Sequence, residues 1–325
     1  MRLFLRLTTV VLGVAWLPAF AAPLFEETSV IDARLSGPFG TLLADKQSSE
    51  YHSFQLQHGT TNLDLKVRLR GNSRRRVCDF PPLRLNFKEE KTTGTVFAGQ
   101  DKLKLVTHCR NGDRGEQDVL EEYLAYRIYN VLTENSLQVR LLRLHYDDSK
   151  GELPDKASPR YAFAIESRNE FAQRTGTEAV TLPGVPVGGY HLEQASLMYV
   201  FQYLVGNTDW SMTRADYDEG CCHNLELFDD NGQILLVPYD FDLVGLVDAR
   251  YAFPDKTLRI KRVTQRLYRG VCEEREALRE SIRKVGSHRA AIMRLVDEIP
   301  GLEAKNRKQA RTYLADYFEL AEDED

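Results

Sequence analysis

Residues 206–242 have the sequence GNTDWSMTRADYDEGCCHNLELFDDNGQILLVPYDFD, which decides how the second half of the chain is organised. Two strand-like runs, 225–228 and 233–239, are joined through Asn231 and Gly232. Asn-Gly is a strong signal for a tight turn, because both central residues of a type I′ turn need positive φ. The stretch therefore predicts a β-hairpin.

Oxygen-bearing side chains flank this hairpin. Asn224 precedes its first strand, and Asp240 and Asp242 follow its second. Asp209 follows an apolar, helix-like run. Because a hairpin returns its far end beside its beginning, we expect Asn224 and Asp240 to lie within a few ångströms of one another. Mg²⁺ and Mn²⁺ prefer carboxylate and amide oxygens and keep positions open for substrate phosphates, so the pattern predicts a metal-and-phosphate site.

The first half of the chain has strand patterns around one helical pattern. Residues 63–70 alternate as LDLKVRLR, which is typical of a half-buried strand. Apolar residues recur every four positions along 120–132, which indicates a helix with one apolar stripe. Further short strands are expected at 83–87, 102–106, 139–146 and 160–166. These elements predict a small, mainly antiparallel sheet with one helix packed on it.

The second half is expected to be mainly helical. Residues 182–189 are rich in Gly and Pro and mark a boundary between lobes. Helical patterns follow at 191–205, at 273–299 with an interruption at Gly286, and at 302–320. The sequence therefore predicts an α+β fold of two lobes. The expected lobes, one rich in sheet and one mainly helical with the hairpin, comprise residues 22–180 and 181–325.

Length and composition exclude several classes of protein. The chain has 325 residues, of which 42% are hydrophobic and 28% are charged, so it can form a large core and is not expected to be disordered. The 43 Lys and Arg residues are balanced by 48 Asp and Glu residues, which gives a net charge of -5. Because this balance provides no overall attraction for phosphate backbones, we do not expect a nucleic-acid-binding protein.

The N-terminus has the pattern of a signal peptide. Residues 1–6 include two arginines, residues 7–17 are almost entirely apolar, and residues 19–21 form the small-x-small pattern of a cleavage site. We expect residues 1–21 to be removed and the mature chain to be secreted or periplasmic. A retained N-terminal anchor is the alternative, although the apolar run is short for a bilayer span. No transmembrane span is expected after cleavage.

Export makes disulfides possible for the five cysteines. Cys78 and Cys109 each end a strand-like segment, and we expect them to pair. We expect Cys272 to pair with either Cys221 or Cys222, which leaves one thiol over. A metal site at Cys221 and Cys222 is less favoured, because adjacent cysteines rarely bind one ion.

Four short motifs occur in order along the chain: RGNS at 70–73, PLRLNF at 82–87, GNTD at 206–209 and PYDFD at 238–242. Together they resemble the CotH family of atypical secreted kinases, over most of the mature chain. The resemblance implies a two-lobed protein-kinase-like fold. It also implies transfer of a phosphoryl group from ATP to a hydroxyl of an exported protein, with Mg²⁺ or Mn²⁺ as cofactor.

The resemblance assigns roles to residues of the second lobe. Asp209 would be the catalytic base or would orient the acceptor hydroxyl. Asn224 and Asp240 would be metal ligands, because an Asn and an Asp at the two ends of a hairpin hold the metal in protein kinases. Asp242 would be a further ligand or would support the first two.

In the first lobe, the resemblance implies a basic residue that contacts nucleotide phosphates and pairs with a helix carboxylate. Lys104 is the first choice for this residue because its strand precedes the long helix, and Glu122 is its expected partner. Arg84 is the alternative phosphate contact. Glu166 falls where the family has an acidic residue near the nucleotide.

The chain departs from the kinase pattern in two ways. Asn224 follows Asp209 by 15 residues, whereas the interval in kinase loops is about five. The inserted residues either loop out, held by a disulfide, or place Asn224 out of reach of the metal. In addition, no Gly-rich phosphate loop is present in the sequence.

Two alternatives to a kinase stay open. One is a kinase-like module without catalysis that binds a partner in the cell envelope. The other is a metal-dependent hydrolase, against which we count the lack of any histidine expected near Asp209, Asp240 or Asp242. We expect all seven histidines to be structural or on the surface, and Arg74, Arg75 and Arg76 to form a solvated turn.

Overall fold

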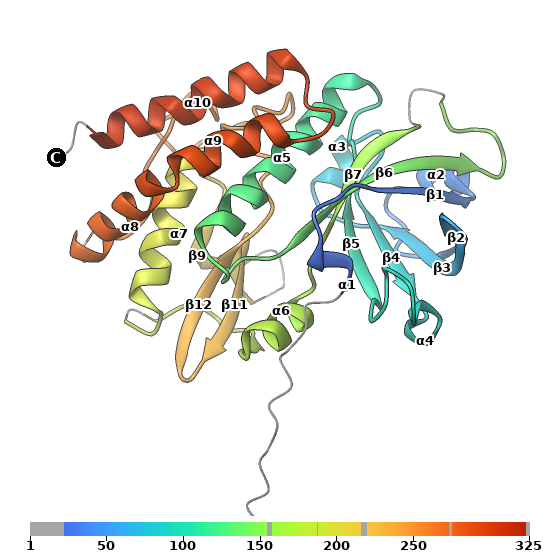
Figure 1. The fold of residues 1–325 in the computed structure, drawn as a ribbon, viewed down its shortest axis with the longest axis horizontal. Coiled ribbons are helices and arrows are strands. Elements are labelled where there is room, and N and C mark those ends of the chain that lie inside the picture. The colour runs from blue at the N-terminus through green and yellow to red at the C-terminus, as the bar shows by residue number, and fades with distance from the viewer. Residues whose placement is uncertain (1–22, 155–157, 187, 216–219, 273–274, 323–325) are drawn as a thin grey trace, which may run out of the picture.

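The fold is mixed α+β, with a β-barrel on one side and helices with a β-hairpin on the other (Figure 1). The computed structural model describes residues 23–154, 158–186, 188–215, 220–272 and 275–322. The expected signal peptide, residues 1–21, lies outside the described residues. Within the described ranges, no helix combines the length and the apolar character that crossing a bilayer requires.

Seven strands close into a barrel in the first half. In spatial order they are β1 (Ile31–Gly37), β2 (His52–His58), β3 (Thr61–Leu69), β4 (Leu83–Phe87), β5 (Lys102–Val106), β7 (Arg160–Ile165) and β6 (Val139–Asp148). All neighbours are antiparallel except β1 and β6. The five strands from β3 to β7 confirm the sequence prediction. The other two, β1 and β2, were not predicted, and they turn the expected sheet into a closed barrel.

A short helix, α1 (Pro23–Glu26), precedes the barrel, and three more join its strands: α2 (Phe39–Ala44), α3 (Arg74–Val77) and α4 (Glu89–Thr92). The segment after α3 is fastened to the segment after β5 by a disulfide between Cys78 and Cys109, which confirms the predicted pair. Phe80 and Cys109 also form an isolated antiparallel bridge. The position of α3 relative to the barrel is therefore fixed by covalent and main-chain bonds.

Helix α5 (Asp113–Leu132) lies between the barrel and the other helices and is buried on most of its surface. It contacts β7 on one side and α9 on another. Its Gly115 allows a close approach, because a Cβ there would lie 2.3 Å from the carbonyl oxygens of His108 and Arg110. Further along the same helix, Glu121 and Glu122 are also buried.

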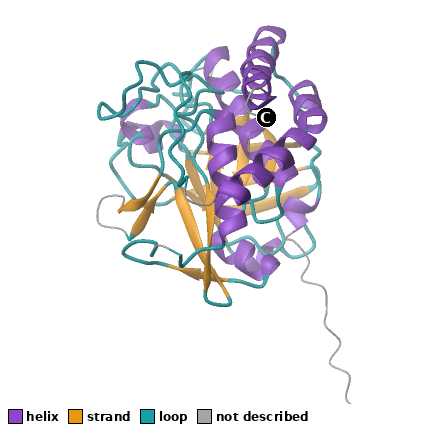
Figure 2. Ribbon diagram, turned by 90° about the vertical axis from the view of Figure 1, so that its left-hand side faces the viewer, coloured by secondary structure: helices purple, strands orange, loops and turns teal. Residues whose placement is uncertain are grey.

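The second half contains a three-stranded sheet, a separate two-stranded ribbon and a group of helices. Its larger elements are α6 (Arg168–Thr175), β8 (Glu178–Val180), α7 (Leu192–Val205), β11 (Leu225–Asp230), β12 (Gln233–Pro238), α8 (Arg275–Ser287), α9 (Arg289–Glu298) and α10 (Ala304–Glu322). Figure 2 shows most of the helices gathered on one side of the strands. The hairpin β11–β12 is confirmed, with Asp230 opposite Gln233 across the Asn-Gly turn. Strand β8, which falls in the expected first lobe, pairs with β11.

The residues between Asp209 and Asn224 form a separate two-stranded ribbon. Its strands are β9 (Ser211–Ala215) and β10 (Cys221–His223), which pair antiparallel. Cys221 and Cys222 form a disulfide with each other, and Cys272 is an exposed free thiol. The predicted pairing of Cys272 with one of them is wrong, because each of the two sulfurs is already bonded to the other.

A buried carboxyl in α5 makes the stability of the fold sensitive to pH. Burial raises the pKa of Glu121 to about 8 from an ordinary value of 4.5, although the Asn306 amide donates a hydrogen bond of 2.9 Å to this carboxyl. The folded state therefore holds a proton that the unfolded chain releases. This contribution to the free energy of unfolding is present below about pH 4.5 and is lost as the pH rises to about 8.

Glu121→Gln should remove this dependence, because glutamine has the shape of the protonated acid and still accepts the bond from Asn306. Urea unfolding at pH 5 to 8 should show that the free energy of unfolding of the variant rises relative to that of the parent, by up to about 1.4 kcal/mol per pH unit. Glu298→Gln, at an exposed position of α9, is the matched control and should follow the parent. Parallel curves for Glu121→Gln and the parent would refute the assignment.

Candidate functional site

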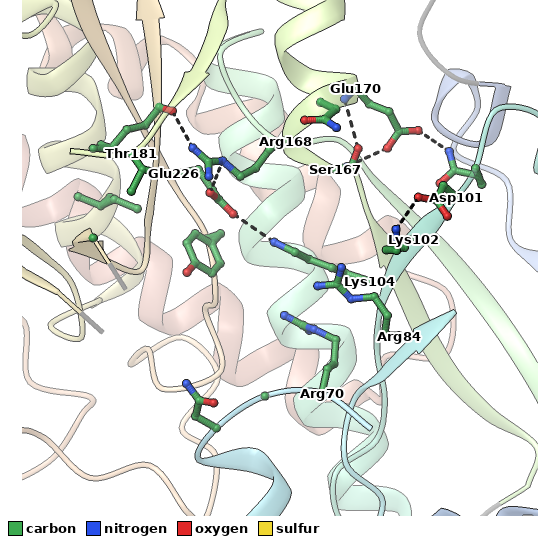
Figure 3. A pocket seen from close by; sticks show the side chains of 18 of the residues that line it. Arg70, Arg84, Asp101, Lys102, Lys104, Ser167, Arg168, Glu170, Thr181 and Glu226 are labelled. Carbon is green, nitrogen blue, oxygen red and sulfur yellow. Dashed lines mark hydrogen bonds and ion pairs between the residues drawn. The ribbon is translucent and has the colours of Figure 1, made fainter. Parts of the chain in front are cut away.

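A cavity of about 1110 Å³ lies between the barrel and the hairpin. Its walls come from β3, β4 and β5 on the barrel side, and from α6, β8 and β11 on the other side. Arg70, Arg84 and Lys104 extend into it, with Glu226 facing them (Figure 3). The cavity also borders Leu225 and Tyr239, which are the neighbours of Asn224 and Asp240 in the sequence. The predicted metal site therefore adjoins a cavity lined by cations.

Three basic residues form a row across the barrel wall. Arg68 is the direct cross-strand partner of Arg84, and Arg84 is the direct partner of Lys104. Like charges directly opposite one another destabilise a sheet. Burial and the nearby Arg70 and Arg68 all lower the pKa of Arg84, in that order of importance. The row is an electrostatic cost to the barrel that a bound anion would offset.

Lys104 pairs with Glu226 of β11, not with Glu122 as predicted. Its ammonium lies 3.1 Å from the Glu226 carboxylate, and Arg168 lies 2.8 Å from the other oxygen of that carboxylate. Burial lowers the pKa of Lys104, although Glu226 opposes the shift. The predicted Lys104–Glu122 pair is wrong because the hairpin, which is remote in sequence, supplies the nearer carboxylate. Lys104 and Arg84 both lie in the cavity wall, and their contact with phosphates stays a prediction.

Arg74 takes the place expected of Lys104 as the partner of Glu122. Its guanidinium is bidentate to Glu122 at 3.0 and 3.1 Å, bonds Asp242 at 2.8 Å, and also contacts Asp240. The prediction that Arg74 belongs to a solvated turn is wrong, since 5% of the residue is exposed. The run of three arginines gave no local signal that one of them turns inward. Arg74 thus joins α3, α5 and the end of the hairpin.

One guanidinium faces three carboxylates, so this cluster has excess negative charge. Burial alone would lower the pKa of Arg74, but Asp240, Asp242 and Glu122 outweigh it and hold the pKa well above its ordinary value. Burial raises the pKa of Glu122 and of Asp242 even though Arg74 opposes it. Arg74 is therefore permanently charged, whereas burial favours the protonated forms of Glu122 and Asp242, and a further cation nearby would favour their ionised forms.

Asp209, Asn224 and His223 form a second cluster. The Asn224 amide donates to the Asp209 carboxylate at 3.1 Å and to the Asp209 carbonyl at 2.7 Å. Nε2 of His223 lies 2.9 Å from the other Asp209 oxygen. The long interval between Asp209 and Asn224 therefore loops out as the β9–β10 ribbon. The expectation that no histidine lies near Asp209 is wrong, because His223 ends that ribbon beside Asn224.

The hairpin holds the two clusters at one end. The Tyr239 amide donates to the Asn224 carbonyl at 3.2 Å, so the main chains on either side of Asn224 and Asp240 are adjacent, as predicted. The Asp240 amide donates to the Tyr126 hydroxyl of α5 at 2.9 Å. Both Asn224 and Asp240 have positive φ, at 54° and 63°, a conformation that residues other than glycine adopt mainly where surrounding contacts impose it.

Of the three predicted metal ligands, Asn224 and Asp240 leave an oxygen available, and metal binding at them stays a prediction. Because Asn224 donates through Nδ2, its Oδ1 is left as an acceptor. Asp240 contacts Arg74 through one oxygen, and its side chain is 40% exposed. Asp242 fits less well, because it is buried and bonded to Arg74. Among the described residues no three His, Cys, Asp or Glu side chains gather as a metal cluster, so the donor set is an amide and a carboxylate beside the cavity.

Glu166 is engaged by protein groups. Arg174 contacts both of its oxygens, at 2.8 and 2.9 Å, and the Gln138 amide donates to one of them at 2.9 Å. Glu166 is buried, with 2% of its surface exposed. Its carboxylate links the end of β7 to α6 and to the start of β6. This geometry gives Glu166 a structural role and does not support the predicted contact with a nucleotide.

No protein-family model and no curated protein matches this sequence. Among solved structures, the chain is similar to the crystal structure of a Helicobacter pylori proinflammatory kinase, CtkA, at 11% sequence identity and a TM-score of 0.38. The match covers 85% of this chain and 92% of that chain. A likeness at this level assigns neither a family nor an activity.

Arg74→Met should destabilise the protein severely, because it leaves three carboxylates around an apolar side chain. Removing one partner of a buried ion pair typically costs about 3–5 kcal/mol. Urea unfolding at pH 7 should show a loss of this size. Arg110→Met, whose ion pair with Asp79 is half exposed, should cost less than about 1 kcal/mol. A loss below 1 kcal/mol for Arg74→Met would contradict the role of Arg74.

Proposed function

We propose that this protein is an exported, CotH-like kinase that transfers a phosphoryl group from ATP to a hydroxyl of a protein acceptor. In this proposal the barrel side and the helical side are the two lobes of a kinase-like fold, with ATP in the cavity between them. Export and the protein acceptor rest on the signal-peptide pattern and on the family resemblance.

One observation carries the proposal. The Asn224 amide holds the Asp209 carboxylate at the same end of the hairpin from which Asp240 follows, although 15 residues separate Asn224 from Asp209. In the proposal these three residues supply an acceptor-orienting carboxylate, an amide oxygen and a second carboxylate, and their chain neighbours Leu225 and Tyr239 line the cavity that holds the cations. This combination is the one that phosphoryl transfer by positioning and charge neutralisation needs.

The proposal gives each residue of the site a role in binding or catalysis. Arg84 and Lys104 would bind the phosphates of the donor and orient them along the cavity. Asp209, held by Asn224 and His223, would accept a hydrogen bond from the acceptor hydroxyl and take its proton. Asn224 and Asp240 would hold Mg²⁺ or Mn²⁺, which neutralises phosphate charge when bound.

The contacts of Asn224 bear on the alternative of a binding module without catalysis. That alternative rested on the long interval from Asp209 to Asn224, and the interval does not keep the two side chains apart. The position of His223 beside Asp209 favours the hydrolase alternative, which had been counted against for lack of a nearby histidine. It lacks a third metal-binding His, Cys, Asp or Glu side chain among the described residues. We therefore retain the kinase as the proposal.

Binding of ATP and Mn²⁺ should raise the thermal midpoint of the purified protein, because a ligand that binds only the native state stabilises it by mass action. Asp209→Asn should keep this shift but lose transfer of radiolabelled phosphate, by roughly 10²-fold or more for a proton-accepting group. Asp64→Asn, on an outward-facing position of β3, is the control and should match the parent.

An unchanged midpoint at millimolar ATP and Mn²⁺ would count against any nucleotide site. A midpoint shift without transfer in the parent, tested with casein as a generic acceptor and by autophosphorylation, would favour the binding module instead. Full transfer by Asp209→Asn would overturn the assignment of Asp209.

A further inference from the structure

The basic residues of the cavity wall indicate which part of the phosphoryl donor the cavity binds. The barrel side of the cavity carries Arg68, Arg84 and Lys104 on adjacent strands, and Arg70 directly after β3. In the described part of the chain, Arg68, Arg70 and Arg84 form no ion pair with a carboxylate. Nε of Arg84 is also buried there without a hydrogen-bond partner. A buried N–H without an acceptor is costly to the fold, which points to a ligand that supplies an acceptor.

Three of the four acidic residues that line the cavity are already engaged by protein groups, and the fourth, Glu89, is exposed. Glu226 is shared by Lys104 and Arg168. Asp101 pairs with Lys102 at 3.0 Å, and Glu170 caps the start of α6 (Figure 3). The three arginines are therefore a local excess of positive charge in a protein whose net charge is negative.

Little apolar surface faces the cavity for a nucleobase to stack on. The apolar residues of its wall include Leu225 and Leu227, which are 3% and 1% exposed. The ring of Tyr239 is already approached by the Lys104 ammonium, 5.3 Å from its centroid. Small-molecule sites usually combine an apolar wall with a few polar groups, whereas here the charged groups dominate.

We propose that this cavity recognises a linear polyphosphate chain through Arg68, Arg70 and Arg84, whether or not a nucleoside is attached to it. Guanidinium groups bond phosphate oxygens in bidentate fashion, and the cross-strand register of Arg68 and Arg84 spaces two of them along the barrel wall. The inference deepens the proposed function, since the same cavity would hold the phosphoryl donor. It predicts that the phosphate chain, and not the base, sets the affinity.

Isothermal titration calorimetry of the purified protein at constant Mg²⁺ tests this specificity. The probes are inorganic tripolyphosphate, ATP, GTP and AMP. Tripolyphosphate, ATP and GTP should bind with Kd values within about threefold of one another. AMP should bind at least tenfold more weakly, because it lacks the phosphates that the arginines bond.

Arg84→Gln should weaken the binding of tripolyphosphate and of ATP by about tenfold or more, which is the usual loss for a hydrogen bond to a charged group. The same variant without ligand should have a higher thermal midpoint than the parent, because it relieves repulsion among neighbouring cations. Arg34→Gln, on barrel strand β1 outside the cavity, is the matched control and should leave the affinity unchanged.

The outcomes separate this inference from the proposed function. Tight binding of ATP with tripolyphosphate more than tenfold weaker would overturn the inference and leave the kinase proposal standing. AMP binding as tightly as ATP, or an unchanged affinity in Arg84→Gln, would also overturn it. Failure of all four ligands to bind at millimolar concentration would refute both.

Discussion

The buried guanidinium of Arg74 is the interaction on which the site depends. It is the common partner of Glu122, Asp240 and Asp242, which come from α5 and from the segment after the hairpin, while Arg74 itself lies in α3 of the barrel side. The Cys78–Cys109 disulfide anchors the segment that follows α3. A fork of five fixed N–H donors can serve several carboxylates at once, which a lysine ammonium does with less geometric definition. The relative placement of the two sides is thereby tied to the placement of Asp240.

Charge of both signs is segregated around the end of the hairpin. The barrel wall presents a row of cations, and the segment after β12 presents carboxylates in excess over Arg74. Each group alone is a cost to folding, since like charges are held together with partial burial. In the proposed function, a polyanion bound with a divalent cation would neutralise both groups at once.

Local pattern was sufficient for part of the fold. Strands β4 and β5 and the hairpin have the expected bounds within one or two residues, because alternation and an Asn-Gly turn are encoded within a few positions. The strand β2 was not predicted, since its sequence HSFQLQH has only two inward apolar residues among polar ones. The pairing Cys78–Cys109 was also predictable, whereas the disulfide between Cys221 and Cys222 depends on a ribbon that no turn signal indicated.

The ion pairs of the site could not be predicted from the sequence. The carboxylate that reaches Lys104 comes from Glu226, 122 residues away, and only the packing of the hairpin against the barrel brings it there. Arg74 shares its local sequence with two other arginines, so nothing in that run distinguishes the buried side chain. The sequence identified Asp209 and Asn224 as candidate site residues. Their hydrogen bond to each other could not be predicted, because it depends on the inserted β9–β10 ribbon folding away from them.

The most direct test of the account is a crystal structure with Mn²⁺ and a non-hydrolysable triphosphate analogue, in which anomalous scattering locates the metal. The account predicts a manganese peak within coordination distance of Asn224 Oδ1 and an Asp240 oxygen. It also predicts that the triphosphate contacts Arg84, and that Arg74 keeps its bond to Glu122. A metal bound elsewhere, or a triphosphate outside the cavity between β4 and β11, would contradict it.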